Sequence, residues 1–168
     1  MSIAESVERA TAYLNEHPDE ARYRDSYARA TIRSGLLVDV AGPTGESVTT
    51  DMPAGIGGTA TAPSPGWYLR AAAASCVCAL IGIRAAAIGI ELDRVEVTVD
   101  SESDDRGILG LDPAIDAGAL SMKVVVAIRA RGRDAAELDE LARWAVAHCP
   151  VTDTVRRAVS TEIEVNVS

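Results

Sequence analysis

Hydrophobic residues recur at helical spacing at the start of the chain, behind a capping pattern. Ser2 and Glu5 form a capping box, in which each side chain satisfies a free backbone N–H group of the first helical turn. The apolar positions of this segment are Ile3, Val7, Ala10 and Leu14. The pattern predicts a helix that ends at Pro18, followed over residues 19–30 by a short helix or an ordered connector. We interpret residues 1–30 as an N-terminal helical extension.

Alternating hydrophobic and polar residues predict strands in the rest of the chain. Residues 31–40 and 46–50 form two such runs around the turn sequence Gly42-Pro43-Thr44-Gly45, which predicts a β-hairpin. Further strands are predicted over Arg94–Glu102, Ala119–Arg131 and Thr161–Val167. The acidic segment 103–107 predicts a turn between the first two of these strands.

Segments of helical spacing alternate with the strands. The longest predicted helix is Trp67–Ile90, and because it is apolar nearly all round, we expect it to be a buried central helix. Asp134 caps a second predicted helix, and a third is predicted over Val151–Val159. Strands packed around a central helix define an α+β fold, and we assign residues 31–168 to one domain.

Composition narrows the class of protein. The 16 basic and 25 acidic residues give a formal net charge of −9, which argues against sequence-independent binding to nucleic acid or to an anionic membrane. The N-terminus carries early acidic residues and no apolar run typical of a secretory signal. The most apolar run, between Arg70 and Arg84, is shorter than the roughly 20 residues of a membrane span. We therefore expect a soluble, cytoplasmic protein with no nucleic-acid and no membrane partner.

Three cysteines carry the candidate chemistry. Cys76 and Cys78 lie in the alanine-rich predicted helix, where residues two apart point to nearly opposite sides, so only one can face a given pocket. Cys149 lies on the core-facing stripe of the second predicted helix. Three cysteines do not form a secreted disulfide framework, so each thiol is either an inert core residue or a reactive one. We expect Cys78 to be a core residue, whereas Cys76 and Cys149 are either a redox pair or two structural thiols.

The two candidate thiols differ in how they would be activated. Cys149 precedes a new helix at Pro150, and a thiol at a helix N-terminus has its pKa lowered by free N–H groups and the helix dipole. Cys76 lies about two to three turns inside its own helix, where the dipole has little effect. Its activation would need a nearby cation, for which Arg84 and Arg33 are the candidates.

Patterns that could indicate a metal or dinucleotide site are weaker than the cysteine patterns. A zinc site built from Cys76, Cys78, His148 and Cys149 is disfavoured, because a C-x-C pair inside a helix and an adjacent His-Cys pair chelate poorly. Residues 55–60 match a dinucleotide-binding fingerprint in spacing, but the flanking prolines prevent a helix from starting there. We therefore expect no metal and no cofactor.

The two cysteine motifs resemble a known family. The segment from Pro63 to Cys76 is similar to the part of the OsmC/Ohr superfamily in which a proline-containing loop leads into an alanine-rich helix ending in the reactive cysteine. The sequence His148-Cys149-Pro150-Val151 resembles the second-cysteine motif of that family. Val95–Val99 and the turn 101–107 between them also look like the family. The likeness covers about Thr31 to Ser168.

This resemblance implies an OsmC-like fold, with antiparallel sheets wrapped around long central helices in an intertwined homodimer. It also implies a thiol-dependent peroxidase in which Cys76 attacks an organic hydroperoxide and becomes a sulfenic acid that Cys149 resolves as a disulfide. A dihydrolipoyl group or another dithiol would re-reduce the pair, and Arg33 is the best candidate for the activating arginine.

One position departs from the family pattern. In the hydroperoxide-resistance branch, a glutamate ten residues before the reactive cysteine holds the activating arginine, whereas this chain has Gly66 there. The departure leaves two further interpretations open. One is a non-enzymatic, redox-sensing protein that binds lipids or other apolar small molecules, and the other is a structural dimer with inert thiols.

Overall fold

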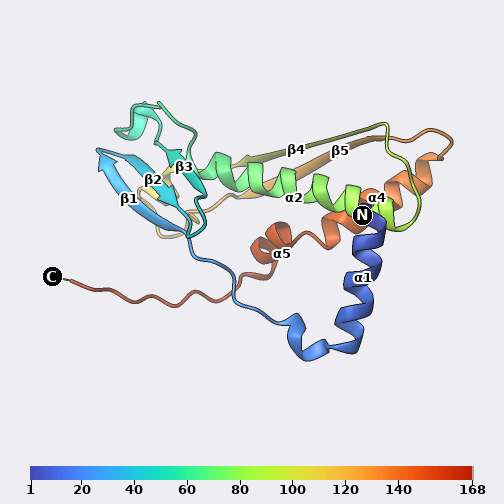
Figure 1. The fold of residues 1–168 in the computed structure, drawn as a ribbon. Helices are drawn as coiled ribbons and strands as arrows, with labels where there is room; N and C mark the ends of the chain where they lie inside the picture. The colour runs from blue at the N-terminus through green and yellow to red at the C-terminus, as the bar shows by residue number, and fades with distance from the viewer. Residues whose placement is uncertain (168) are drawn as a thin grey trace. The chain divides into compact units, whose positions relative to one another are not determined.

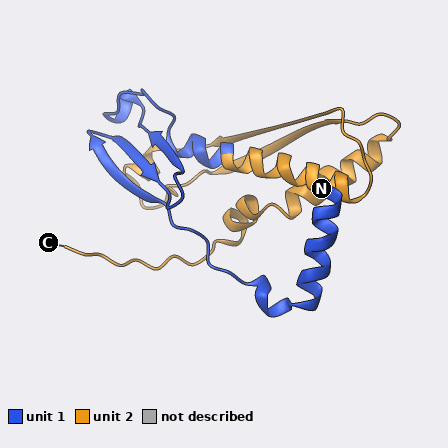
Figure 2. Cartoon of the chain, in the orientation of Figure 1, with its two compact units in different colours: residues 1–71 blue, residues 72–168 orange. Residues whose placement is uncertain are grey.

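The computed structural model describes residues 1–167 of the chain. The chain forms two compact units, residues 1–71 and residues 72–168, which Figure 2 distinguishes by colour. Figure 1 shows that each unit contains a small antiparallel sheet together with helices. The sequence predicted an extension over residues 1–30 and a domain over residues 31–168. This division stays a prediction, and Ser168 lies outside the described residues.

Unit 1 begins with the predicted helix α1, Ile3–Glu16. The capping box is formed: the N–H of Glu5 donates to Ser2 Oγ at 3.2 Å, and the N–H of Ser2 donates to the Glu5 carboxylate at 2.6 Å. A short 3-10 helix, η1 (Pro18–Ala21), follows, and residues 22–28 form an irregular connector. The prediction of a helix and a connector is therefore confirmed in this segment.

The sheet of unit 1 has three antiparallel strands in the order β1-β2-β3. They are β1 (Arg29–Ser34), β2 (Leu37–Ala41) and β3 (Ser47–Thr50). The prediction of a single strand over residues 31–40 is wrong, because Gly35 adopts a φ of +57° and turns the chain back between two strands. The predicted hairpin corresponds to β2 and β3, in which Val40 lies opposite Val48.

The long helix α2 runs from Pro65 to Ala87, after a short 3-10 helix, η2 (Ala54–Ile56). Ser64 Oγ accepts the N–H of Trp67 at 3.2 Å and caps the first turn. The prediction that α2 is buried all round is wrong for this chain, because only one stripe is buried. That stripe, at four-residue spacing, consists of Ala73, Val77, Ile81 and Ala85. By length and composition alone α2 could cross a membrane, a test that core helices of soluble proteins also pass.

Unit 2 contains a two-stranded sheet and three further helices. The strands β4 (Arg94–Glu102) and β5 (Ser121–Arg129) pair antiparallel, with Val97 opposite Val126. The helices are α3 (Asp105–Ile108), α4 (Ala135–Ala147) and α5 (Pro150–Arg157). Asp134 caps α4 as predicted, by accepting the N–H of Glu137 at 2.8 Å. The predicted turn over residues 103–107 instead contains the single helical turn α3.

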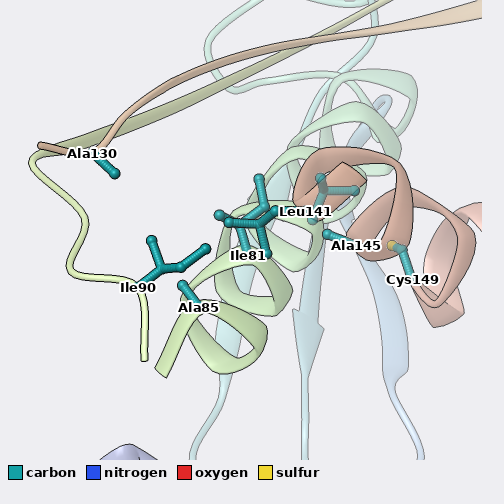
Figure 3. Packing of buried hydrophobic residues seen from close by; sticks show 8 residues of the cluster. Ile81, Ala85, Ile90, Ala130, Leu141, Ala145 and Cys149 are labelled. Carbon is teal, nitrogen blue, oxygen red and sulfur yellow. The ribbon is translucent and has the colours of Figure 1, made fainter. Parts of the chain in front are cut away.

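The core of unit 2 lies between α2 and α4. Ile81 of α2 and Leu141 of α4 point toward one another, and Ala145 and Cys149 continue the same stripe toward the end of α4 (Figure 3). Burying a large aliphatic side chain of this kind contributes about 1.5–3 kcal/mol. Valines and isoleucine from the inner face of β4 and β5 pack against this cluster. This packing fixes α2 against α4 and thereby the cysteines that the two helices carry.

The predicted closing strand over Thr161–Val167 is wrong for the isolated chain. The segment is irregular, and Ile163 and Val165 are 85% and 74% exposed. A strand needs a neighbour to satisfy its backbone N–H and C=O groups. Among residues 1–167 no strand pairs with this segment, although its alternating pattern is that of a strand with one apolar face.

Candidate active site

Cys149 lies at the junction between α4 and α5. It is the N-cap residue of α5 and has extended backbone angles (φ −72°, ψ 115°), because a following proline disfavours the helical conformation. The carbonyl of Cys149 accepts the N–H of Asp153 at 2.9 Å, which is the first hydrogen bond of α5. The Cys149 side chain is 0% exposed. The predicted position of this thiol, in the core and at a helix N-terminus, is confirmed.

Several groups are directed at the Cys149 sulfur. Burial raises the pKa of this thiol, but the N–H and hydroxyl groups of Thr152, the thiol of Cys76 and the N–H of Val151 act in the opposite direction. Their combined effect prevails, so the pKa of Cys149 lies below its ordinary value. The Thr152 hydroxyl oxygen also lies 3.1 and 3.2 Å from the carbonyl oxygens of Val146 and Cys149, so these acceptors compete for its single proton.

Cys76 has the opposite electrostatic environment. It is partly buried on α2 and packs against the core cluster that contains Cys149. Burial raises the pKa of the Cys76 thiol, and both the hydrogen bond to Cys149 and the charge of that residue raise it further. Only the N–H of Val151 acts to lower it. The two candidate thiols are therefore both free and lie in the same core cluster, where each influences the pKa of the other.

Cys78 differs from its prediction as a core residue. It is only partly buried and is not among the residues that pack against the core cluster of unit 2. The reason is its position two residues after Cys76, which places it on another side of α2.

The two candidate arginines are both engaged by other residues. Arg33 of β1 donates from Nε to Asp39 Oδ2 at 2.7 Å and from Nη2 to Oδ1, and its guanidinium holds the pKa of Asp39 below the ordinary value. Arg84 of α2 lies over the ring of Trp144, with its guanidinium carbon 5.0 Å from the ring centroid. Arg33 belongs to unit 1 and the thiol pair to unit 2, and the role of Arg33 stays a prediction.

Gly66, at the position of the family glutamate, lies in the first turn of α2. A Cβ at this position would lie 3.7 Å from Arg70 Nη1 and 3.9 Å from Ser64 Oγ, which are ordinary contact distances. The backbone therefore has room for a side chain at residue 66, next to a guanidinium. Arg70 was not singled out from the sequence, because nothing in its spacing marks it as different from the other arginines.

The loop that leads into α2 is fixed by a buried carboxylate. Asp51 is 2% exposed and accepts hydrogen bonds from Thr59 Oγ1 at 2.6 Å, from the N–H of Thr61 at 3.0 Å and from the N–H of Met52 at 2.8 Å. The Thr59 hydroxyl, followed by the N–H of Thr61, holds the pKa of Asp51 well below its usual range. This carboxylate also was not predicted, since an Asp in a loop rich in glycine and proline gives no signal of burial.

Unit 2 also contains an open cavity of about 600 Å³. Its apolar lining comes from Val124, Val126, Ala142, Val146 and Ala147, and its polar lining from Asp139, Arg143, Thr152 and Arg156. Thr152 thus borders the cavity and also contacts the Cys149 sulfur. Within residues 1–167 there is no cluster of three His, Cys, Asp or Glu side chains able to hold a metal ion.

The sequence matches the model of the OsmC family, described as OsmC-like protein, over residues 58–164, and the chain belongs to this family. A comparison with curated protein sequences finds no match. The matched residues include both thiols of the pair. Family membership, which the cysteine motifs indicated, is therefore confirmed.

Solved structures of the family resemble the fold of this chain. The organic hydroperoxide resistance protein OsmC of Legionella pneumophila is 22% identical with a TM-score of 0.58, and the match covers 80% of this chain and 91% of that protein. The OsmC like protein of Mycoplasma pneumoniae is 18% identical with a TM-score of 0.63, and the match covers 80% of this chain and 88% of that protein. The organic hydroperoxide resistance protein of Elizabethkingia anophelis, with thiocyanate bound, is 17% identical with a TM-score of 0.59, and the match covers 80% of this chain and 90% of that protein. At these identities the matches establish the fold, which is α+β and OsmC-like, with antiparallel sheets and a long central helix.

Proposed function

We propose that this chain is a thiol-dependent peroxidase that reduces organic hydroperoxides, with Cys76 as the attacking thiol and Cys149 as the resolving thiol. The observation that carries the proposal is that two free thiols, one buried and one partly buried, belong to the same core cluster of unit 2. Membership of the OsmC family supports it, since two of the similar structures are organic hydroperoxide resistance proteins.

The pair can complete a peroxidase cycle without a metal or an organic cofactor. The Cys76 sulfur takes the terminal oxygen of the hydroperoxide, which leaves as an alcohol, and Cys76 becomes a sulfenic acid. Cys149 then attacks the Cys76 sulfur and releases water, which forms a disulfide. A dithiol such as a dihydrolipoyl group reduces that disulfide by exchange and restores both thiols.

The surroundings of the pair suit an apolar substrate. Cys76 and Cys149 lie among aliphatic side chains of α2 and α4, and one part of the cavity lining in unit 2 consists of valines and alanines, beside Asp139, Arg143, Thr152 and Arg156. An apolar wall of this kind favours hydroperoxides with alkyl or aryl groups over hydrogen peroxide.

Activation of Cys76 is assigned to Arg33 within a homodimer. Asp39 fixes the Arg33 guanidinium through two hydrogen bonds, which is the role that a glutamate has in the hydroperoxide-resistance branch. An intertwined homodimer is supported by the strand-like pattern and exposed apolar residues of the C-terminal segment, which would pair with a second copy. We propose a cytoplasmic location, and the net charge of −9 disfavours an anionic-membrane or nucleic-acid partner.

The experiment is to add one equivalent of cumene hydroperoxide to the reduced protein and to follow intact mass and peptide masses. Rapid loss of about two daltons, mapped to a peptide pair joined by Cys76 and Cys149, is the expected result. Cys76→Ser should abolish peroxide consumption, and Cys78→Ser, which changes a thiol outside the pair, should not. Unchanged consumption in Cys76→Ser would contradict the proposal.

A second candidate function is favoured by Gly66, which stands where the hydroperoxide-resistance branch has its glutamate. In this case the chain binds apolar molecules or senses redox state without turnover. The same experiment separates the two functions: a binding protein would retain free thiols after peroxide addition and would still bind an apolar fluorescent probe.

A further inference from the structure

Side chains from three neighbouring strands meet on one face of the sheet of unit 1. Asp39 of β2 lies directly opposite Thr49 of β3. Arg33 of β1 lies where the register with β2 shifts between Ile32 and Ser34, so it has no residue directly opposite it on β2. An extra residue of this kind bends the strand and re-aims its side chain, and the Arg33 side chain is directed at Asp39.

The Asp39 carboxylate joins the other two side chains. Its Oδ2 accepts the Arg33 Nε–H at 2.7 Å, and its Oδ1 accepts Arg33 Nη2 and also the Thr49 hydroxyl, the latter at 3.1 Å. The two hydrogen bonds from Arg33 form the bidentate arrangement that fixes the plane of a guanidinium relative to a carboxylate. The Thr49 hydroxyl in turn restricts rotation of that carboxylate. The guanidinium is therefore oriented by side chains of β2 and β3.

The Thr49 hydroxyl matters because the ion pair alone is exposed. The side chains of Arg33 and Asp39 are 56% and 43% exposed in this chain, and a pair in contact with water holds one geometry only weakly. A neutral donor on the carboxylate removes part of that freedom. The Arg33 guanidinium, followed by the Thr49 hydroxyl, also holds the pKa of Asp39 below its ordinary value, so the acceptor of these hydrogen bonds is ionised at neutral pH.

The strand that carries Thr49 is itself attached to helix α2. β3 is an edge strand of the sheet, so one side of its backbone has no strand neighbour within this sheet. The Tyr68 hydroxyl, from the first turns of α2, donates to the carbonyl of Thr49 at 3.2 Å. α2 is also the helix that carries Cys76. A continuous series of hydrogen bonds therefore leads from Arg33 through Asp39 and Thr49 to that helix.

We propose that Thr49 is a positioning residue for Arg33: its hydroxyl holds the Asp39 carboxylate in the orientation that directs the guanidinium, and Tyr68 holds the strand of Thr49 on α2. This inference rests on the proposed peroxidase function, in which Arg33 activates Cys76. It assigns the orientation of the arginine to the sheet of unit 1, in a chain that lacks the glutamate of the hydroperoxide-resistance branch. Thr49 acts through Asp39 and Arg33, and no step of the reaction uses its own atoms.

The first test removes the Thr49 hydroxyl. Thr49→Val keeps the branched shape that suits a strand, Thr49→Ser keeps the hydroxyl, and Thr50→Val makes the same change on the opposite face of β3. Thr49→Val should lower kcat/KM for cumene hydroperoxide on the order of tenfold, because the guanidinium is then less well oriented. Thr49→Ser should retain most of the activity and Thr50→Val all of it. Equal values for Thr49→Val and Thr50→Val would overturn the inference.

The second readout is the Cys76 thiol, because a loss of activity alone would also follow from a damaged sheet. The rate of alkylation by iodoacetamide is followed against pH in a Cys78→Ala background, and peptide masses assign the label to Cys76. Arg33→Ala should shift this profile to higher pH, since a nearby cation favours the thiolate, and Thr49→Val should shift it in the same direction. A profile that Arg33→Ala shifts and Thr49→Val leaves unchanged would refute the inference. Circular dichroism shows whether each variant is folded.

Two further measurements test whether these residues act in series. If Thr49 acts through Arg33, Thr49→Val should cause no further loss in an Arg33→Ala background, whereas independent effects would multiply. Tyr68→Phe should lower kcat/KM about threefold, and the control Tyr23→Phe, at a side chain that is 79% exposed, should not. Losses that multiply would contradict the role of Thr49, and an unchanged value for Tyr68→Phe would contradict the role of Tyr68.

Failure of the proposed function and failure of this inference remain distinguishable. If the unmodified chain does not consume hydroperoxide, the peroxidase proposal fails, and the alkylation profiles still show whether Thr49 acts on Arg33. If the chain consumes hydroperoxide and Arg33→Ala lowers the rate but Thr49→Val does not, the peroxidase proposal stands and the inference is wrong. If Arg33→Ala changes neither the rate nor the profile, the inference fails together with the role of Arg33.

Discussion

Replacement of Leu141 by alanine tests the packing that holds the thiol pair together. Leu141 is 2% exposed, faces Ile81 across the α2–α4 contact and lies on the same stripe of α4 as Cys149 (Figure 3). The substitution removes three carbon atoms, which at about 0.8 kcal/mol each gives about 2.4 kcal/mol for the lost transfer free energy. The cavity left behind adds to this, so the free energy of unfolding should fall by about 3–4 kcal/mol.

The assay is urea unfolding followed by far-ultraviolet circular dichroism at one fixed protein concentration, which avoids a contribution from mass action. The matched control is Leu111→Ala, the same substitution at a side chain that is 69% exposed in this chain, and it should cost less than about 0.5 kcal/mol. Because a looser α4 also moves Cys149 relative to Cys76, oxidation of Leu141→Ala should form the disulfide more slowly. A cost below about 1 kcal/mol, or a cost equal to that of the control, would refute the assignment of Leu141 to the core.

Three further substitutions test other parts of the chain. Gly66→Glu should raise kcat/KM for cumene hydroperoxide on the order of tenfold, because it adds a second carboxylate, at the position used by the hydroperoxide-resistance branch, to the one that Asp39 already offers Arg33; an unchanged value would contradict this. Gly58→Ala should lower the free energy of unfolding by about 1–3 kcal/mol in a urea titration, because the added Cβ would lie 1.8 Å from the carbonyl oxygen of Met52. The control is Gly55→Ala, which should have little effect because the space around residue 55 is open. Asp51→Asn should lower the Tm at pH 7. The native pKa of this carboxyl is depressed, so the ionised carboxylate stabilises the fold above about pH 4, and this stabilisation is lost as the pH falls further. The difference in Tm between Asp51→Asn and the unmodified chain should therefore shrink toward pH 3, and a constant difference would contradict this assignment.

Local chemistry made several elements predictable. The capping residues Ser2 and Asp134 start helices where expected, and the alternation over Arg94–Glu102 marks a strand with the bounds that the structure has. The Cys-Pro junction placed Cys149 at a helix N-terminus, because proline restricts the residue before it. In each case the signal and the structural element involve residues that are close in sequence.

Other features depend on contacts that a linear pattern does not contain. Gly35 lies inside an apolar run that indicates one strand, and only its positive φ turns the run into two. The alternation over Thr161–Val167 has the pattern of a strand, but a strand requires a paired neighbour, and none is found among the described residues of this chain. The contact between Cys76 and Cys149 depends on how two helices far apart in sequence pack, so the sequence left the redox pair and two inert thiols as equal alternatives.

The two tryptophans of the chain lie in different units. Trp67, in unit 1, is 49% exposed, whereas Trp144, in unit 2, stacks on the ring of His148 with a centroid distance of 4.2 Å. Each unit consequently carries one tryptophan in a distinct environment. The variants Trp67→Phe and Trp144→Phe would leave one tryptophan in one unit at a time, and the two melting curves, recorded with excitation selective for tryptophan, would show whether the units unfold in one cooperative transition or in two.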